Sequence, residues 1–190
     1  AYLQKVAPKF KLKVLALYAD QAEWPKFIGQ VEAGRPTALP RFAMLCVTDK
    51  MPKKKYDSPA MRKEFSRYNQ WFSLAANNRP LAALLTSQGN RKLKEIMGLD
   101  IGFKFKTDDY TKKLAETSSS LTLGARVSFN LYGQGSEVYL TATALGVGDK
   151  LVFMAYFENT GPAEKMAGVE AKTLAWRDEM SRLNAGQYKK

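Results

Sequence analysis

Apolar and polar residues alternate with a period of two in several segments of this chain, which is the pattern of a strand with one buried face. Residues 10–18 open with alternating apolar residues and lysines and then become continuously apolar, which predicts a strand whose first half is exposed on one face. Residues 42–47 form a short, wholly apolar run that predicts a buried strand. The alternating pattern returns later in the chain, at 103–106, 121–123, 127–131, 138–144 and 151–157.

Elsewhere, apolar residues recur at spacings of three and four, as they do along one face of a helix. Asp20 precedes such a segment and Gly34 follows it, so we expect a helix over residues 21–33. A further helical region, with interruptions, is expected from Ser58 to Gly98.

The chain closes with a long predicted helix. Asn159 or Thr160 caps its start, and Gly186 follows its end. Its apolar stripe is expected to lie on a sheet, and comprises Met166, Val169, Thr173, Trp176, Met180 and Leu183.

Helices before and after an antiparallel meander predict an α+β fold, in which the helices pack on a mainly antiparallel sheet of about five to seven strands. We find no internal repeat, low-complexity tract or linker, so we expect residues 1–190 to form a single domain. The chain holds no run of about 18 apolar residues, so no membrane span is predicted. Its start at Ala1, in a lysine-rich segment, favours a processed export product, and a cytoplasmic location stays an alternative.

The net charge of +12 is unevenly distributed along the chain. Residues 1–113 hold 22 basic and 10 acidic side chains, whereas residues 114–190 hold eight of each. We therefore divide the domain into a basic N-terminal half and a neutral half formed by the meander and the closing helix. The candidate partner-binding residues of the basic half are Lys53, Lys54, Lys55, Arg91, Lys92 and Lys94.

A structural explanation of these lysines competes with the functional one. A lysine-rich loop is often only a solvated surface, and lysines on exposed strand faces discourage edge-to-edge pairing of sheets. Nucleic-acid binding would need aromatic residues beside the basic ones for base stacking. In residues 10–13 and 103–106, period-two geometry places the aromatic residues on the face opposite the lysines, which counts against a stacking surface.

Several kinds of chemistry find no support in the sequence. The chain has no histidine, which removes imidazole bases and zinc sites with a histidine ligand. Cys46, the single cysteine, lies in an apolar run and is interpreted as a buried structural residue. Residues 118–120 and 108–109 are interpreted as loop and turn, and the glycines at 146–149 as a hairpin rather than a phosphate loop. We predict no catalytic residue, cofactor or metal site.

The last third of the chain also resembles a known group of proteins. It combines the turn at 148–150, the aromatic-rich strand 151–157 and a capped long helix that contains Trp176. This unit is similar to the closing unit of uncharacterised exported bacterial proteins and, more distantly, of PsbP-like proteins. Trp24, Phe27 and the Gly-Arg-Pro sequence at 34–36 loosely resemble the same bacterial group. The resemblance implies a layered α/β/α sandwich, a periplasmic or otherwise exported location, and a binding or accessory role.

Taken together, these features predict a non-enzymatic, exported binding or accessory protein. Its basic N-terminal half would contact another protein or a component of the cell envelope. One alternative is a protein that binds nucleic acid or an anionic membrane through the same residues. A second alternative is an enzyme that uses carboxylates or lysines in a pocket.

Overall fold

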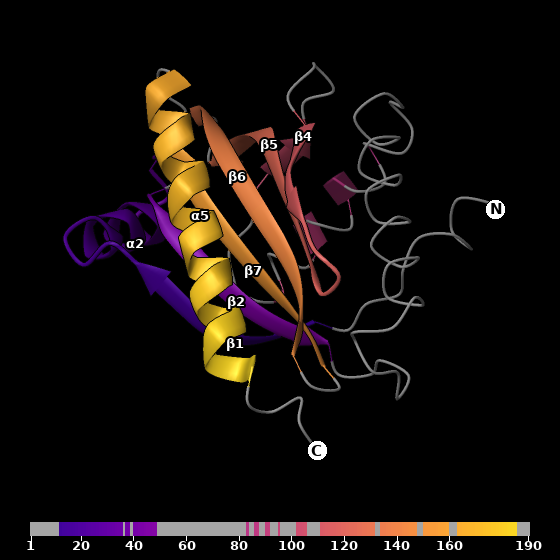
Figure 1. Ribbon diagram of the computed structural model, residues 1–190. Coiled ribbons are helices and arrows are strands. Elements are labelled where there is room, and N and C mark those ends of the chain that lie inside the picture. Colours follow the sequence, from indigo (N-terminus) through magenta and orange to yellow (C-terminus); the bar gives the residue numbers. More distant parts are fainter. Residues whose placement is uncertain are drawn as a thin grey trace, which may run out of the picture.

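A computed structural model provides the structure of the chain (Figure 1). It describes residues 12–48, 102–105 and 111–185, apart from positions 36, 39, 132–133, 148–149 and 160–162. It also describes isolated helical positions at 83, 86, 87, 90, 91 and 95. Most of the predicted helical region from Ser58 to Gly98 therefore lies outside the described residues.

Within the described residues, seven strands form one antiparallel sheet, in agreement with the predicted α+β fold. The order across the sheet is β1-β2-β7-β6-β5, and both β3 and β4 pair with the outer edge of β5. The strands are β1 (Leu12–Ala19), β2 (Phe42–Thr48), β3 (Gly102–Phe105), β4 (Thr111–Glu116), β5 (Ser120–Leu131), β6 (Gln134–Val147) and β7 (Lys150–Asn159).

The helix α2 (Trp24–Glu32) packs on one face of this sheet. Its buried residues Phe27 and Val31 join a core cluster with Phe42 of β2 and Phe157 of β7. The rings of Phe42 and Phe157 stack with their centroids 4.2 Å apart, as expected of partners in the β2–β7 register. Gly34, at a φ of 62°, ends this helical segment in the left-handed conformation predicted from the sequence.

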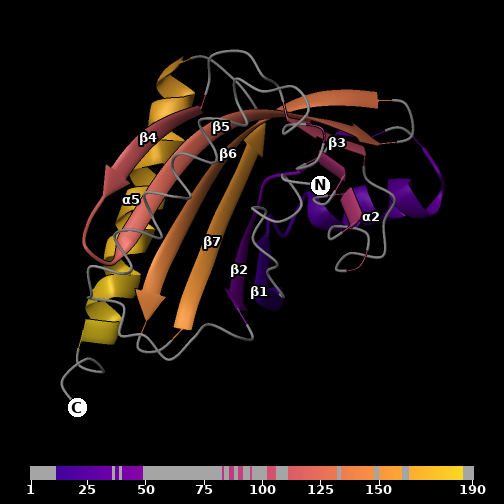
Figure 2. The same ribbon diagram turned by 90° about the vertical axis from the view of Figure 1, so that its right-hand side faces the viewer.

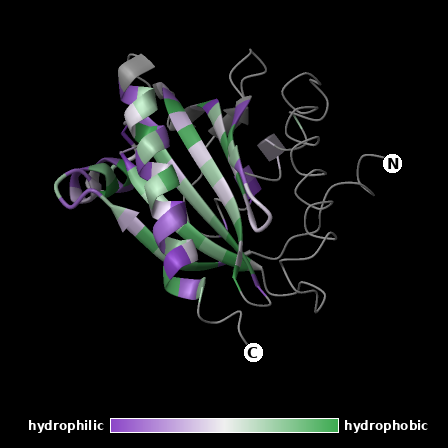
Figure 3. Cartoon of the chain, in the orientation of Figure 1, coloured by the Kyte–Doolittle hydropathy of each residue, from purple (hydrophilic) through white to green (hydrophobic). Residues whose placement is uncertain are grey.

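The helix α5 (Ala163–Asn184) lies on the opposite face. Its contacts are with Tyr139 of β6 and Met154 of β7, whose side chains alternate with those that face α2. The sheet is therefore the middle layer between two helices (Figure 2), which is the α/β/α arrangement expected. The strands are mainly hydrophobic, whereas α5 carries both kinds of residue (Figure 3). In the described part of the chain, no helix combines the length and apolar content needed to cross a bilayer.

Three details differ from the sequence-based expectations. Leu183, predicted to lie on the sheet, is 60% exposed because it sits in the last turn of α5. Asp20 was expected to cap the helix directly, but it caps the turn that precedes α2. Its carboxylate accepts hydrogen bonds from the backbone N–H groups of Ala22 and Glu23. The strand β4 was not expected, because its sequence Thr-Lys-Lys-Leu-Ala-Glu lacks an apolar alternation.

A close approach at Gly124 of β5 provides a test of the α5 face. A Cβ atom at this position would overlap the hydroxyl of Tyr139 and lie 3.0 Å from its Cζ atom. Because Tyr139 is fully buried, we expect Gly124→Ala to lower the free energy of unfolding by about 1–3 kcal/mol. Denaturant unfolding measures this change.

The matched control is Gly168→Ala on α5, where nothing lies within 4 Å of the added Cβ atom. This change should stabilise the protein by up to about 1 kcal/mol, because alanine favours a helix interior. Adding Tyr139→Phe to Gly124→Ala should restore only part of the loss, since the ring itself remains close. A Gly124→Ala protein as stable as the wild type would contradict the packing described.

Candidate functional site: a cavity between α5 and the sheet

One row of residues crosses the sheet on the face that α5 covers. The strand register pairs Ala43 of β2 with Tyr18 of β1 on one side and with Tyr156 of β7 on the other. Tyr156 in turn pairs with Thr141 of β6, and Thr141 with Gly124 of β5. The small Ala43 side chain thus lies between two tyrosines, which leaves a hollow above it.

The helix α5 closes this hollow from above. Thr173 donates its hydroxyl hydrogen to the carbonyl of Val169, so Thr141 must be the donor in the 2.6 Å hydrogen bond between the two threonines. This buried bond fixes the helix over the row, and Trp176 follows one turn later. The indole of Trp176 meets the ring of Tyr18 edge-on, with their centroids 6.3 Å apart.

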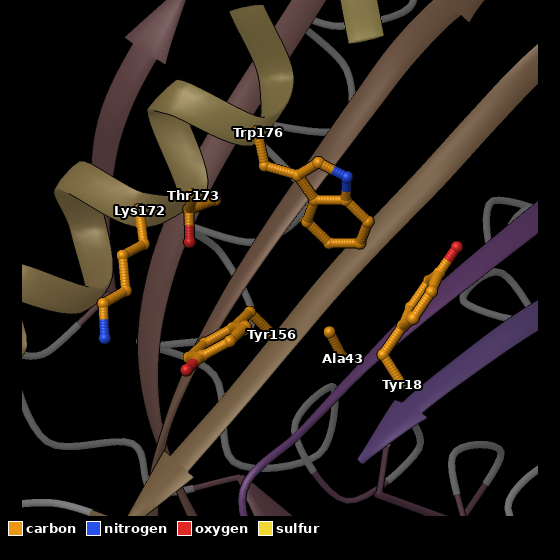
Figure 4. A pocket seen from close by; sticks show the side chains of 6 residues that line it. All are labelled: Tyr18, Ala43, Tyr156, Lys172, Thr173 and Trp176. Atoms are coloured by element: carbon orange, nitrogen blue, oxygen red, sulfur yellow. The ribbon is translucent and has the colours of Figure 1, made fainter. Parts of the chain in front are cut away.

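The result is a cavity of about 250 Å³ between the helix and the sheet. Figure 4 shows its lining: Tyr18, Ala43, Tyr156, Lys172, Thr173 and Trp176. Three aromatic rings and a methyl group supply most of this surface. The Lys172 ammonium and the Tyr156 hydroxyl lie towards the same side of the cavity in this view (Figure 4).

The position of α5 is also fixed from its other side. The Tyr139 hydroxyl donates a 2.6 Å hydrogen bond to Glu170 of α5, and the Lys112 ammonium of β4 lies 2.8 Å from the same carboxylate oxygen. Gly124 leaves the space that the Tyr139 hydroxyl occupies. The helix is thus tied towards β4 and β5, and β1 and β2 stay at the open side of the cavity.

A group of charged residues lies next to Tyr156. The carboxylate of Glu158 is buried, and it accepts a 3.0 Å hydrogen bond from the Tyr156 hydroxyl. The Lys165 ammonium lies 3.4 Å from Glu158, and the Arg41 guanidinium lies 3.9 Å from it. Arg41 also pairs with Asp20 at 2.6 Å. These contacts compensate the buried charge of Glu158.

The same contacts shift the pKa values of three groups. Burial, together with the hydrogen bond to Glu158, raises the pKa of Tyr156 to about 12. The hydrogen bond from Arg41 lowers the pKa of Asp20 below its ordinary value and raises the pKa of Arg41 above its own. Tyr156 is therefore a neutral hydroxyl at physiological pH.

The cavity is suited to binding an apolar group beside a positive charge. The Thr173 and Tyr156 hydroxyls already donate to other protein atoms, which leaves Lys172 as the charged group on the lining. Cys46 is buried on the opposite face, and burial raises the pKa of its thiol to about 11, so it is protonated at neutral pH. Among the described residues, no cluster of three or more acidic or cysteine side chains could hold a metal ion.

Of the residues predicted to bind a partner, Arg91 is the one that the structure describes, and it does not line this cavity. Arg91 is exposed at a helical position, with its Nε atom 4.0 Å from Glu95. The other five predicted residues, Lys53, Lys54, Lys55, Lys92 and Lys94, lie outside the described residues. The basic surface that they would form stays a prediction.

The cavity itself was missed because its residues are far apart in the sequence. Tyr18, Ala43 and Tyr156 each fit an ordinary strand pattern, and only the strand register places them in one row. Trp176 was predicted to lie on the sheet, and it does so at the border of the cavity, half-buried. The available signal in the sequence was Ala43, a small residue in a strand whose other residues are mostly larger and apolar.

No protein-family model, no curated protein and no solved structure matches this chain. No activity, substrate or partner therefore comes to it by similarity, and the resemblance to PsbP-like proteins stays a prediction.

The raised pKa of Tyr156 predicts a loss of stability at high pH. Folding keeps this hydroxyl protonated, so its contribution is complete below pH 10, the ordinary pKa, and is lost as the pH rises towards 12. Between pH 9 and pH 11, the unfolding free energy of Tyr156→Phe should therefore fall by about 1 kcal/mol less than that of the wild type. The difference is this small because the residue is partly exposed. Urea unfolding at both pH values measures the difference. An equal loss in the variant and the wild type would contradict the assignment.

Proposed function

We propose that this protein is a non-enzymatic binding protein that holds an apolar, carboxylate-bearing group of a protein or envelope partner in the cavity between α5 and the sheet. The observation that carries this proposal is the lining itself: aromatic walls over Ala43, with Lys172 as the charged group. An apolar segment would contact the rings, and its carboxylate would pair with the ammonium of Lys172.

The size of the cavity favours an anchoring group over a whole cofactor. Its volume of about 250 Å³ is below the roughly 300–1,000 Å³ of pockets that enclose drug-sized ligands. Aromatic pockets of modest size are typical of protein interfaces, where one buried side chain supplies much of the binding free energy. An aromatic or branched apolar group of a larger partner suits this volume.

The charges around the cavity favour an anion. Lys172, Lys165 and Arg41 are the cations on or beside it, and Glu158 and Asp20 are the anions that already engage Arg41. Among the described residues, Lys172 has no ion-pair partner of its own, so its ammonium can meet a ligand carboxylate.

Two parts of the sequence-based hypothesis extend this proposal. The basic N-terminal half would add long-range attraction for an acidic partner. An exported location has the resemblance to exported bacterial proteins as its support. Binding of nucleic acid or an anionic membrane remains the alternative for the predicted basic surface, and it is separated from the present proposal by steep salt dependence.

A pair of small probes tests the proposal. We expect 4-phenylbutyrate to bind and 4-phenylbutylamine, which carries the opposite charge on a similar tail, to bind at least about tenfold more weakly. The indole N–H signal of Trp176, assigned with Trp176→Phe, should shift in NMR titrations. Lys172→Gln should weaken phenylbutyrate binding and should not weaken binding of the amine, since it removes a positive charge that attracts the carboxylate and repels the ammonium.

Lys26→Gln provides the control for charge alone, because Lys26 is an exposed lysine of α2 on the opposite face. This variant should bind phenylbutyrate like the wild type. Equal binding of the two probes, or equal losses in the two lysine variants, would refute the role given to Lys172.

A further inference from the structure

The outer edge of β1 is a second surface of the molecule, and it adjoins the α5 cavity at Tyr18. β1 is the last strand of the sheet within the described residues, so alternate backbone N–H and C=O groups along it point away from the sheet. Such an edge accepts a further strand unless charges, prolines, bulges or a cover prevent it.

The opposite edge of the sheet, where β4 lies, is protected in this way. The six residues of β4 include Lys112, Lys113 and Glu116, and a bulge interrupts its pairing with β5. Charged side chains and a bulge are the usual means by which sheet edges avoid pairing with other chains.

β1 is protected over its first half only. Lys13 is its single charged residue, and a bulge at Leu15 separates the two halves of its pairing with β2. Residues 15–19 carry no charge and no proline. Three of their side chains are large, apolar and exposed: Leu15 at 52%, Leu17 at 41% and Tyr18 at 57%. These are three of the four large hydrophobic residues that are exposed in the described part of the chain.

We propose that the edge of β1 at residues 15–19 binds an extended, acidic segment of a partner protein as an additional strand of the sheet. Backbone hydrogen bonds to the outer edge would hold the segment in place. Its apolar side chains would cover Leu15 and Leu17, and an acidic residue near the start of β1 would pair with Lys13.

The charge of the protein favours an acidic segment over a second copy of the chain. Each copy carries a net charge of +12, with the whole excess in the half of the sequence that contains β1. Two copies of the chain would repel each other through their net charges, whereas an acidic segment would lower the net charge of the complex.

Hydrogen exchange with a designed peptide tests this proposal. The probe is an acetylated, amidated heptapeptide of alternating glutamate and valine, and its lysine–valine counterpart is the control. We expect the glutamate peptide to slow the exchange of alternate amides of β1 and the lysine peptide to leave them unchanged.

A charge placed on the edge should abolish the interaction. We expect Leu15→Lys to weaken glutamate-peptide binding at least about tenfold at an unchanged melting temperature, since Leu15 is mostly exposed. Leu183→Lys makes the same change at an exposed leucine of α5 and should bind the peptide like the wild type.

Three results would overturn the proposal. The first is a glutamate peptide that leaves β1 unprotected, and the second is equal protection by the lysine peptide. The third is a dimer in sedimentation velocity whose β1 amides are already protected without peptide, because the edge would then belong to a second copy.

Discussion

The lateral position of α5 on the sheet is the constraint on which the rest of the structure depends. Two contacts fix it: the Thr141–Thr173 hydrogen bond beneath the helix, and the bonds of Tyr139 and Lys112 to Glu170 along one side. The buried Thr141–Thr173 bond contributes about 1 kcal/mol, and it would cost more if one partner were left unpaired. Because these bonds hold the helix over β6 and β7, Trp176 reaches from its other side to Tyr18 of β1, and the cavity is the space that remains beneath.

Two small residues of one cross-strand row have opposite effects on this arrangement. Gly124 makes room for the hydroxyl of Tyr139, so the hollow above it is filled and helps to attach the helix. Ala43 leaves room that no neighbouring side chain fills, so the hollow above it stays open between Tyr18 and Tyr156. Gly124 thus contributes to the packing of the helix, and Ala43 creates the candidate site.

Much of the fold follows from periodicity, but the site does not. The apolar runs at 42–47 and 151–157 and the closing helix were predicted because each pattern is local. The strand β4 was missed because it is an edge strand whose lysines interact with solvent and with Glu170 rather than with the core. The cavity depends on register, which relates residues more than 100 positions apart, and no local pattern carries that information. The sequence around Lys172 is that of any exposed helical lysine, and only the fold brings Tyr156 and Trp176 beside it.

The Ala43→Leu variant tests the central claim most directly, because it fills the hollow from its floor. If the cavity is open, the free energy of unfolding should stay the same or rise by up to about 1 kcal/mol through the added apolar burial, while phenylbutyrate binding should fall at least about tenfold. Ala175→Leu, the same change at an exposed position of α5, should leave binding unaltered. A stable Ala43→Leu protein that binds phenylbutyrate like the wild type would contradict this account, as would a loss of several kcal/mol in stability, the sign of a site already filled.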